Sequence, residues 1–161
     1  MSDFEKNVVL RAALLGVMSG MRSAAGPAAM VRRMAKNPKK FEGTVFEWMA
    51  NSTQATFATL AQVGEVVVDK LPFLPPRTSL QPLVVRALAG GGAGTAAFIE
   101  AEKPAPIGWV IGAACAVASS HAFYRARKGV TEATRLPDLP VALAEDGLVL
   151  AFERVVQGSY E

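Results

Sequence analysis

Two segments of this chain place arginine, a hydroxyl side chain and proline in the same order within apolar surroundings. The first is Arg22-Ser23-x-x-x-Pro27 followed by Arg32, and the second is Arg77-Thr78-x-x-x-Pro82 followed by Arg86. Charged groups in apolar surroundings are costly unless they are paired. The near-repeat therefore indicates where a polar site would lie, although it does not identify what is bound or moved there.

Carboxylates that could pair with these arginines lie on both sides of the second segment. They are Glu65 and Asp69, with Lys70 beside them, and later Asp138, Glu145 and Asp146. A spacing of four residues puts Glu65 and Asp69 on one helix face. Glu145 and Asp146 are neighbours and point about 100° apart on a helix. Asp138 precedes this last helix and can favour its positive end.

A network of arginines and carboxylates inside a helical bundle could act in several ways. It could relay protons, bind a cation, or bind an anion on arginines and the N-termini of broken helices. The same pattern is typical of helix caps and interhelical ion pairs that fix packing register. For Arg22, Arg77 and Arg86, the natural partners of the acidic residues, both interpretations stay open.

The composition favours a single apolar domain spanning residues 1–161. Hydrophobic residues make up 51% of the chain, charged residues 19%, the mean hydropathy is +0.26 and the net charge is +3. One cysteine and one histidine exclude an intramolecular disulfide, a multi-cysteine metal site and a histidine cluster within one chain. We therefore expect no metal, and no motif indicates a cofactor. We also expect no cleavable signal peptide, because acidic residues begin the chain and Arg11 interrupts its first apolar run.

The residue pattern predicts an all-α fold, a compact bundle of about five helices. The predicted segments are 8–34, broken within 20–27, then 44–70, 79–99, 107–127 and 140–156. A basic linker covers 32–43, and the near-repeat divides the chain into halves of roughly 8–70 and 77–157. Valine runs at 66–68 and 84–85 fall within helical periodicity, so strands are not expected.

Several features favour a membrane location. Residues 104–124 carry no charge and are long enough to cross a bilayer. Small residues recur at a spacing that brings helices close together in lipid, in the pairs Gly16 and Gly20, Gly90 and Gly94, and Gly108 and Gly112. The other segments carry charges near their middles, which must face protein or water if they span. The alternative is a buried helix in a soluble bundle.

The basic residues give no simple membrane orientation. One cluster follows the first predicted helix, within 32–40, and another follows the fourth, within 125–135. Positive charge prefers one side of the membrane, yet three crossings between the clusters would put them on opposite sides. Either the polar second segment crosses only in part, or the chain inserts in both orientations.

Motifs for enzymatic or nucleic-acid chemistry are weak. The glycine run at 90–94 lacks the following Lys-Ser/Thr of a phosphate loop. Ser119, Ser120 and His121 are adjacent in sequence but lack the context of a serine nucleophile, and Cys115 reads as a small core residue. The basic linker lacks interleaved aromatic residues, so nucleic-acid binding is not expected. Enzymatic activity stays an open hypothesis, but no motif supports it.

Four stretches also carry a family resemblance: 20–27, 64–72, 76–86 and 136–146. Together they resemble a family of small bacterial integral membrane proteins classed only as a domain of unknown function, family 4126. The resemblance covers nearly the whole chain and implies a multi-helix membrane protein without implying an activity. Its recurrent Gly-Glu-x-x-x-Asp-Lys and Glu-Asp positions correspond here to 64–70 and 145–146. This chain departs from the pattern in the polar start of its second helix and in Glu100 and Glu102 after its third.

Three hypotheses about function follow. The first is a homo-oligomeric, multi-pass protein of the bacterial inner membrane that conducts or exchanges a small ion or solute through the charged residues. The second is a structural or accessory subunit of a membrane complex, in which the charges fix packing and the glycine and alanine faces bind a partner helix. The third is a peripheral all-α scaffold whose basic linker contacts anionic lipid or an acidic partner.

Overall fold

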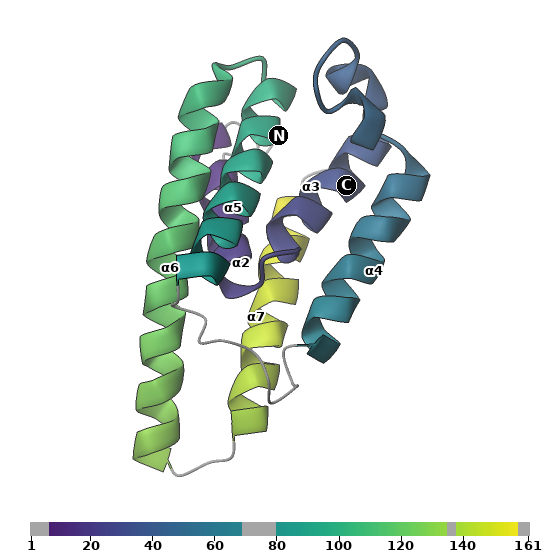
Figure 1. Cartoon of the computed structure of the whole chain (residues 1–161). Helices are drawn as coiled ribbons and strands as arrows, with labels where there is room; N and C mark the ends of the chain where they lie inside the picture. The colour runs from purple at the N-terminus through teal and green to yellow at the C-terminus, as the bar shows by residue number, and fades with distance from the viewer. Residues whose placement is uncertain (1–6, 69–79, 135–137, 158–161) are drawn as a thin grey trace.

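The computed structural model describes residues 7–68, 80–134 and 138–157. In them all regular secondary structure is helical, which confirms the all-α fold class. The α-helices are α2 (Val8–Met21), α3 (Ala25–Lys36), α4 (Ser52–Val68), α5 (Leu80–Glu100), α6 (Ala105–Thr134) and α7 (Asp138–Gln157). Two 3₁₀ turns, η1 (Pro38–Phe41) and η2 (Glu47–Met49), lie between α3 and α4. Figure 1 shows the six α-helices.

The first predicted segment is broken at Arg22, inside the expected interval. Arg22 is extended, with φ −139° and ψ 120°, and its N–H donates to the carbonyl oxygen of Met18 at 2.8 Å. Pro27 lies in the first turn of α3, where a backbone N–H would have no intrahelical acceptor. After the break α3 folds back on α2, so that Gly26 lies against Ser19 (Figure 1). We call this element the α2–α3 hairpin, and residues 22–24 its tip.

The second predicted segment is wrong at its start. A helix was expected from residue 44, but α4 begins at Ser52. Asn51 caps α4 by accepting a hydrogen bond from the N–H of Gln54 at 3.0 Å. Upstream, the Thr44 hydroxyl donates to the carbonyl oxygen of Phe41 at 2.7 Å, and Gly43 has a φ of +72°. Side-chain bonds of this kind compete with helix formation, which explains the irregular connection.

The fourth predicted helix is longer than expected. It was predicted to end near residue 127, with a basic cluster after it, but α6 continues to Thr134. Arg125, Arg127 and Lys128 therefore lie inside the helix rather than in a linker. Arginine and lysine are good helix formers, and Lys128 lies 3.8 Å from Glu132 one turn later. The two basic clusters lie at opposite ends of the bundle (Figure 1).

Three helices pack closely through the six glycines singled out in the sequence. Gly94 of α5 and Gly108 of α6 face each other so closely that a Cβ on either would overlap the other's carbonyl oxygen. Gly90 and Gly16 approach the carbonyl oxygen of Gly112 in the same way, and Gly20 lies against Ser119. The structure thus places all six at the contacts of α2, α5 and α6.

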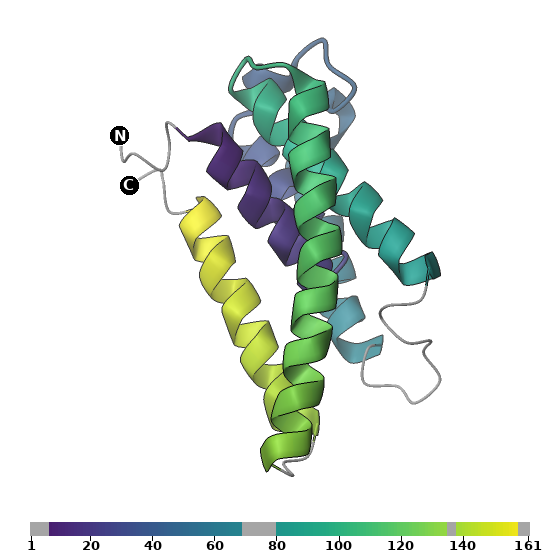
Figure 2. The ribbon, with the colours of Figure 1, turned by 90° about the vertical axis from the view of Figure 1, so that its left-hand side faces the viewer.

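The remaining helices cover this three-helix layer. α3 packs on α2 and α5, and α7 packs on α2, beside which it runs in Figure 2. α4 packs mainly against α3 and lies farthest from α6 in Figure 1. The core between the layers is rich in methionine; its fully buried members include Leu15, Met18, Met21, Met30, Met34 and Phe41.

Two helices of the described part are long and apolar enough to cross a membrane. They are α5 (Leu80–Glu100) and the segment Ala105–Ala133 of α6. α2 is also apolar but has only 14 residues. Core helices of soluble proteins can be equally long and apolar, so the burial of the charged residues also bears on the location of these helices.

Candidate functional site

Several charged side chains are buried in this bundle, while many large apolar side chains are exposed. The buried charged residues among those described are Arg11, Arg22, Arg33, Arg86, Glu100 and Glu145. Large apolar side chains are exposed on α2, α4, α5, α6 and α7; Leu80, for example, is 78% exposed and Val110 61% exposed. Soluble domains rarely bury arginine and glutamate while exposing apolar side chains on most of their helices.

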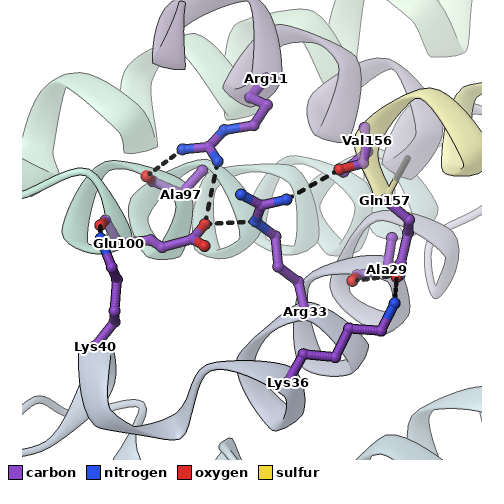
Figure 3. A network of polar contacts seen from close by, with 9 residues as sticks. All are labelled: Arg11, Ala29, Arg33, Lys36, Lys40, Ala97, Glu100, Val156 and Gln157. Carbon is purple, nitrogen blue, oxygen red and sulfur yellow. Dashed lines mark hydrogen bonds and ion pairs between the residues drawn. The ribbon is translucent and has the colours of Figure 1, made fainter. Parts of the chain in front are cut away.

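One buried cluster joins two arginines to a single carboxylate (Figure 3). The Nε of Arg33 donates to the Oε2 of Glu100 at 2.6 Å, and the Nη1 of Arg11 lies 3.3 Å from the same oxygen. Arg11 comes from α2, Arg33 from α3 and Glu100 from the last residue of α5. Since all three side chains are at most 6% exposed, each depends on its partners for its charge to be tolerated.

Backbone carbonyls at this end of the bundle extend the cluster to α7. Arg33 donates through Nη1 to the carbonyl oxygen of Val156 at 3.2 Å. Arg11 donates through Nη2 to that of Ala97 at 3.4 Å, and Gln157 donates through Nε2 to that of Ala29 at 3.1 Å (Figure 3). The cluster therefore ties α2, α3, α5 and α7 together, and we assign it a structural role.

Sequence reasoning missed this cluster. Arg11 was noted only as an interruption, Arg33 as part of a basic linker and Glu100 as a polar residue following a helix. One local signal could have drawn attention to them, because Arg11 is isolated within an apolar helix and Glu100 ends a long apolar one. Their pairing, however, joins residues 67 positions apart, which no local pattern specifies.

The hairpin tip holds a second cluster, which contains some of the residues predicted to form a site. Arg22, 2% exposed, donates from Nε to the Oδ1 of Asp146 at 2.8 Å, and its Nη2 contacts the same oxygen. The adjacent Glu145 turns away, with an oxygen 3.6 Å from the Nη1 of Arg127. The two neighbouring carboxylates thus face different helices, as their 100° separation on α7 requires.

Glu65 caps α3 from a neighbouring helix. Its Oε1 accepts hydrogen bonds from the N–H and the hydroxyl of Ser23, at 2.7 and 2.5 Å, and its Oε2 accepts one from the N–H of Ala24 at 2.8 Å. The free N–H groups of a helix N-terminus attract an anion, and here the chain supplies that anion from α4. The sequence suggested an arginine partner for Glu65 and an external anion at the broken helix. The structure instead joins the carboxylate to the helix N-terminus.

A third cluster, centred on Arg32, joins α3 to α4 and α7. Arg32 of α3 donates to the hydroxyl of Thr59 at 2.9 Å and to the side-chain oxygen of Gln62 at 2.7 Å, both on α4. Its Nη2 also lies 2.5 Å from the Oε1 of Glu153 on α7. Gln62 also donates from Nε2 to the Oε2 of Glu153 at 3.4 Å, so these bonds and the Glu65 cap are among the polar contacts that hold α4 against α3 and α7.

A groove of about 450 Å³ lies between α3, α4 and α7 and connects the second and third clusters. We call it the α3–α4–α7 groove. Its described lining consists of Arg22, Arg32, Thr59, Gln62, Val63, Asp146, Val149, Leu150 and Glu153. It is large enough for a small solute.

The other predicted site residues are placed only in part. Arg86 is buried on α5, and Asp138 begins α7, although its side chain is outside the described ones. Asp69, Lys70 and Arg77 lie outside the described residues.

The hydroxyl groups of Ser119 and Ser120 have a structural role in helix packing. Ser119 and Ser120 donate from their hydroxyls to the carbonyl oxygen of Ala116 within α6, and Ser120 also donates to that of Gly20. These bonds place both hydroxyls at the contact between α2 and α6. Among the described residues, no group of three or more histidine, cysteine, aspartate and glutamate side chains could hold a metal ion.

Comparison with known proteins adds no assignment. No protein-family model matches the chain, and neither a curated protein nor a solved structure matches it. The buried charges, the hairpin tip and the groove are therefore the features that bear on function.

Replacing Glu100 tests whether the buried cluster holds the bundle together. We expect Glu100→Gln to lower the free energy of unfolding by about 3 kcal/mol, because two buried guanidinium groups lose the charge of a shared carboxylate. The matched control is Glu102→Gln, since Glu102 is exposed nearby, and its effect should stay within about 0.5 kcal/mol. Thermal unfolding followed by circular dichroism measures both. Equal effects of the two changes would show that the cluster contributes nothing specific.

Replacing Glu65 tests the interhelical cap. We expect Glu65→Ala to cost about 1–2 kcal/mol and to increase amide hydrogen exchange at Ser23 and Ala24, whose N–H groups lose their acceptor. Exchange along α4 should rise as well, because α4 loses a polar contact to the rest of the bundle. Glu132→Ala, at an exposed ion pair on α6, is the control. Unchanged exchange at Ser23 and Ala24 in Glu65→Ala would contradict the cap.

Proposed function

We propose that this chain is a small multi-pass protein of the bacterial inner membrane that conducts or exchanges a small ion or solute through the α3–α4–α7 groove. The observation that carries the proposal is the burial of several charged side chains beneath an exposed apolar surface. Exposed Leu80, Val84, Phe57 and Val110 suit contact with lipid, and buried arginines and carboxylates suit a polar interior. Ionisable groups inside a membrane bundle usually mark a pathway or a binding site.

The lengths of the helices support this proposal. At about 1.5 Å per residue, the 21 residues of α5 match the roughly 30 Å of a bilayer core. The 30 residues of α6 exceed it, so its basic end from Arg125 onward would project into the headgroups. α2 and α3, with 14 and 12 residues, are each too short to cross.

The α2–α3 hairpin therefore suits a re-entrant element that enters and leaves on one side. Its tip would then lie at membrane depth, where irregular backbone is tolerated only if it is buried in protein or lines a cavity. Both conditions hold at residues 22–24, since Glu65 caps the tip and Arg22 lines the groove. Discontinuous helices of this kind form the solute sites of small transporters. The resemblance of 64–72 to a bacterial membrane family agrees with this proposal.

One observation favours the accessory-subunit alternative. Leu80, Val84, Leu88 and Gly92 recur every four residues along the outer face of α5, and a Cβ at Gly92 would meet open space. A ridge of this kind can pack into the groove of a partner helix, either from a second copy or from a larger complex. The mass of the complex purified from native membranes separates the two, because recovery with a larger assembly in fixed ratio supports the alternative.

Flux through purified protein in liposomes tests the proposed function. After carbonate washing, the protein should stay with the membranes and be released only by detergent. Reconstituted protein should speed the osmotic relaxation of liposomes challenged with potassium chloride, glycerol or glycine, for at least one of these probes. Glu153→Gln should slow that flux by about tenfold, since it removes a charge worth about 1.4 kcal/mol or more in the groove.

The exposed Glu132→Gln variant is the control for this flux assay and should match the unmodified protein. Release by carbonate alone would contradict the membrane location. Relaxation no faster than that of empty liposomes for every probe would contradict transport and leave the accessory role.

A further inference from the structure

The α3–α4–α7 groove has charged ends and an apolar middle. On α7 its lining residues are Asp146, Val149, Leu150 and Glu153, a spacing that puts all four on one helix face. At about 1.5 Å per residue, the two carboxylates are about 10 Å apart along the helix axis. Arg22 stands at the first and Arg32 at the second. An elongated solute lying in this groove would meet charge at both ends and aliphatic side chains between them.

The described lining is electrically balanced. It carries two guanidinium groups and two carboxylates, joined as the pairs Arg22–Asp146 and Arg32–Glu153. Adding a net charge to a partly buried, balanced site is unfavourable, because the added charge loses hydration without gaining a full counter-charge. A solute that carries both charges adds none overall, and can exchange partners with each ion pair. The balance therefore favours a zwitterion over a simple cation or anion.

The Asp146 end has room for a hydrogen-bond donor. Both contacts of Arg22 with Asp146 end on Oδ1. In the described part of the chain, Oδ2 accepts no hydrogen bond, although a carboxylate oxygen can accept two. Asp146 is also 18% exposed, so a group in the groove can reach it. An ammonium group can therefore bind Asp146 without breaking its pair with Arg22.

At the Arg32 end, a hydrogen-bond donor lacks an acceptor. Its Nη1 and Nη2 donate to Thr59, Gln62 and Glu153. Its Nε is buried and has no hydrogen-bond partner among the described residues. A buried donor without an acceptor is costly, and such groups are rare in folded proteins. A carboxylate that takes the place of Glu153 at this edge of the guanidinium could accept from Nε and Nη2 together, which is the favoured bidentate geometry.

From these two ends we propose that the groove binds a linear zwitterion, with its ammonium group at Asp146, its carboxylate at Arg32 and an aliphatic segment over Val149 and Leu150. The chemical class comprises ω-amino acids and short peptides with an aliphatic middle. This proposal rests on the proposed function only in taking the same groove as the site. Binding to detergent-solubilised protein tests it whether or not the protein transports anything.

Three matched probes test the class: ε-aminocaproate carries both charges, hexanoate only the carboxylate, and hexylamine only the ammonium. We expect ε-aminocaproate to bind the purified protein at least about tenfold more tightly than either singly charged probe, by calorimetric titration with protein-free micelles as the blank. Hexanoate or hexylamine binding as tightly as ε-aminocaproate would overturn the proposal. Absence of binding by all three would overturn it as well.

Charge changes in the groove test the orientation. Glu153→Gln leaves an excess positive charge at the Arg32 end, so hexanoate should gain about tenfold in affinity relative to ε-aminocaproate. Arg32→Gln leaves an excess negative charge, so hexylamine should gain by a similar factor. A merely structural role for these residues would lower all three affinities together, which would contradict the proposal. Glu132→Gln, which is exposed on α6, should change none of them.

The result for this site is independent of the proposed function. Flux in liposomes together with tighter binding of a singly charged probe would retain the membrane role and reject the zwitterion. Selective binding of ε-aminocaproate without any flux would retain the site and reject transport. Thermal unfolding of each variant establishes that it is folded before its affinities are compared.

Discussion

The structure depends on the hydrogen bonds made by the polar groups at the tip of the α2–α3 hairpin. Reversing the chain at residues 22–24 exposes backbone N–H groups and an arginine in the interior of an apolar bundle. Such groups are costly unless paired, so other helices must supply acceptors. Glu65 supplies them from α4 and Asp146 from α7. The positions of α4 and α7, and therefore of the groove between them, follow from this requirement.

Local patterns identified much of the fold from the sequence. Pro27 and its neighbouring glycines located the helix break, and the prediction that the chain is all-α is confirmed. The predicted start of α4 and end of α6 were wrong, because side-chain bonds at Thr44 and Asn51 delay the first helix. The good helix formers Arg127 and Lys128 continue the second. Boundaries of this kind depend on individual capping bonds that periodicity does not reveal.

The candidate site was anticipated as a set of residues but not as an arrangement. Arg22, Glu65 and Asp146 were expected to participate, and the structure brings them together at one hairpin tip. The cap formed by Glu65, and the cluster of Arg11, Arg33 and Glu100, arise from contacts between segments far apart in sequence. Spacing predicts which residues share a helix face, whereas tertiary packing decides which helix that face meets.

The central claim is that the apolar exterior of this bundle contacts lipid, and spin labels measure this most directly. In a Cys115→Ala background, single cysteines at Leu88 and Val110, both exposed on spanning candidates, carry a nitroxide label, and a cysteine at Lys103 in the α5–α6 turn is the aqueous reference. In lipid vesicles, labels at Leu88 and Val110 should collide more with dissolved oxygen than with a water-soluble nickel chelate, and Lys103 should show the reverse. Preferential collision with the nickel chelate at Leu88 and Val110 would contradict the account.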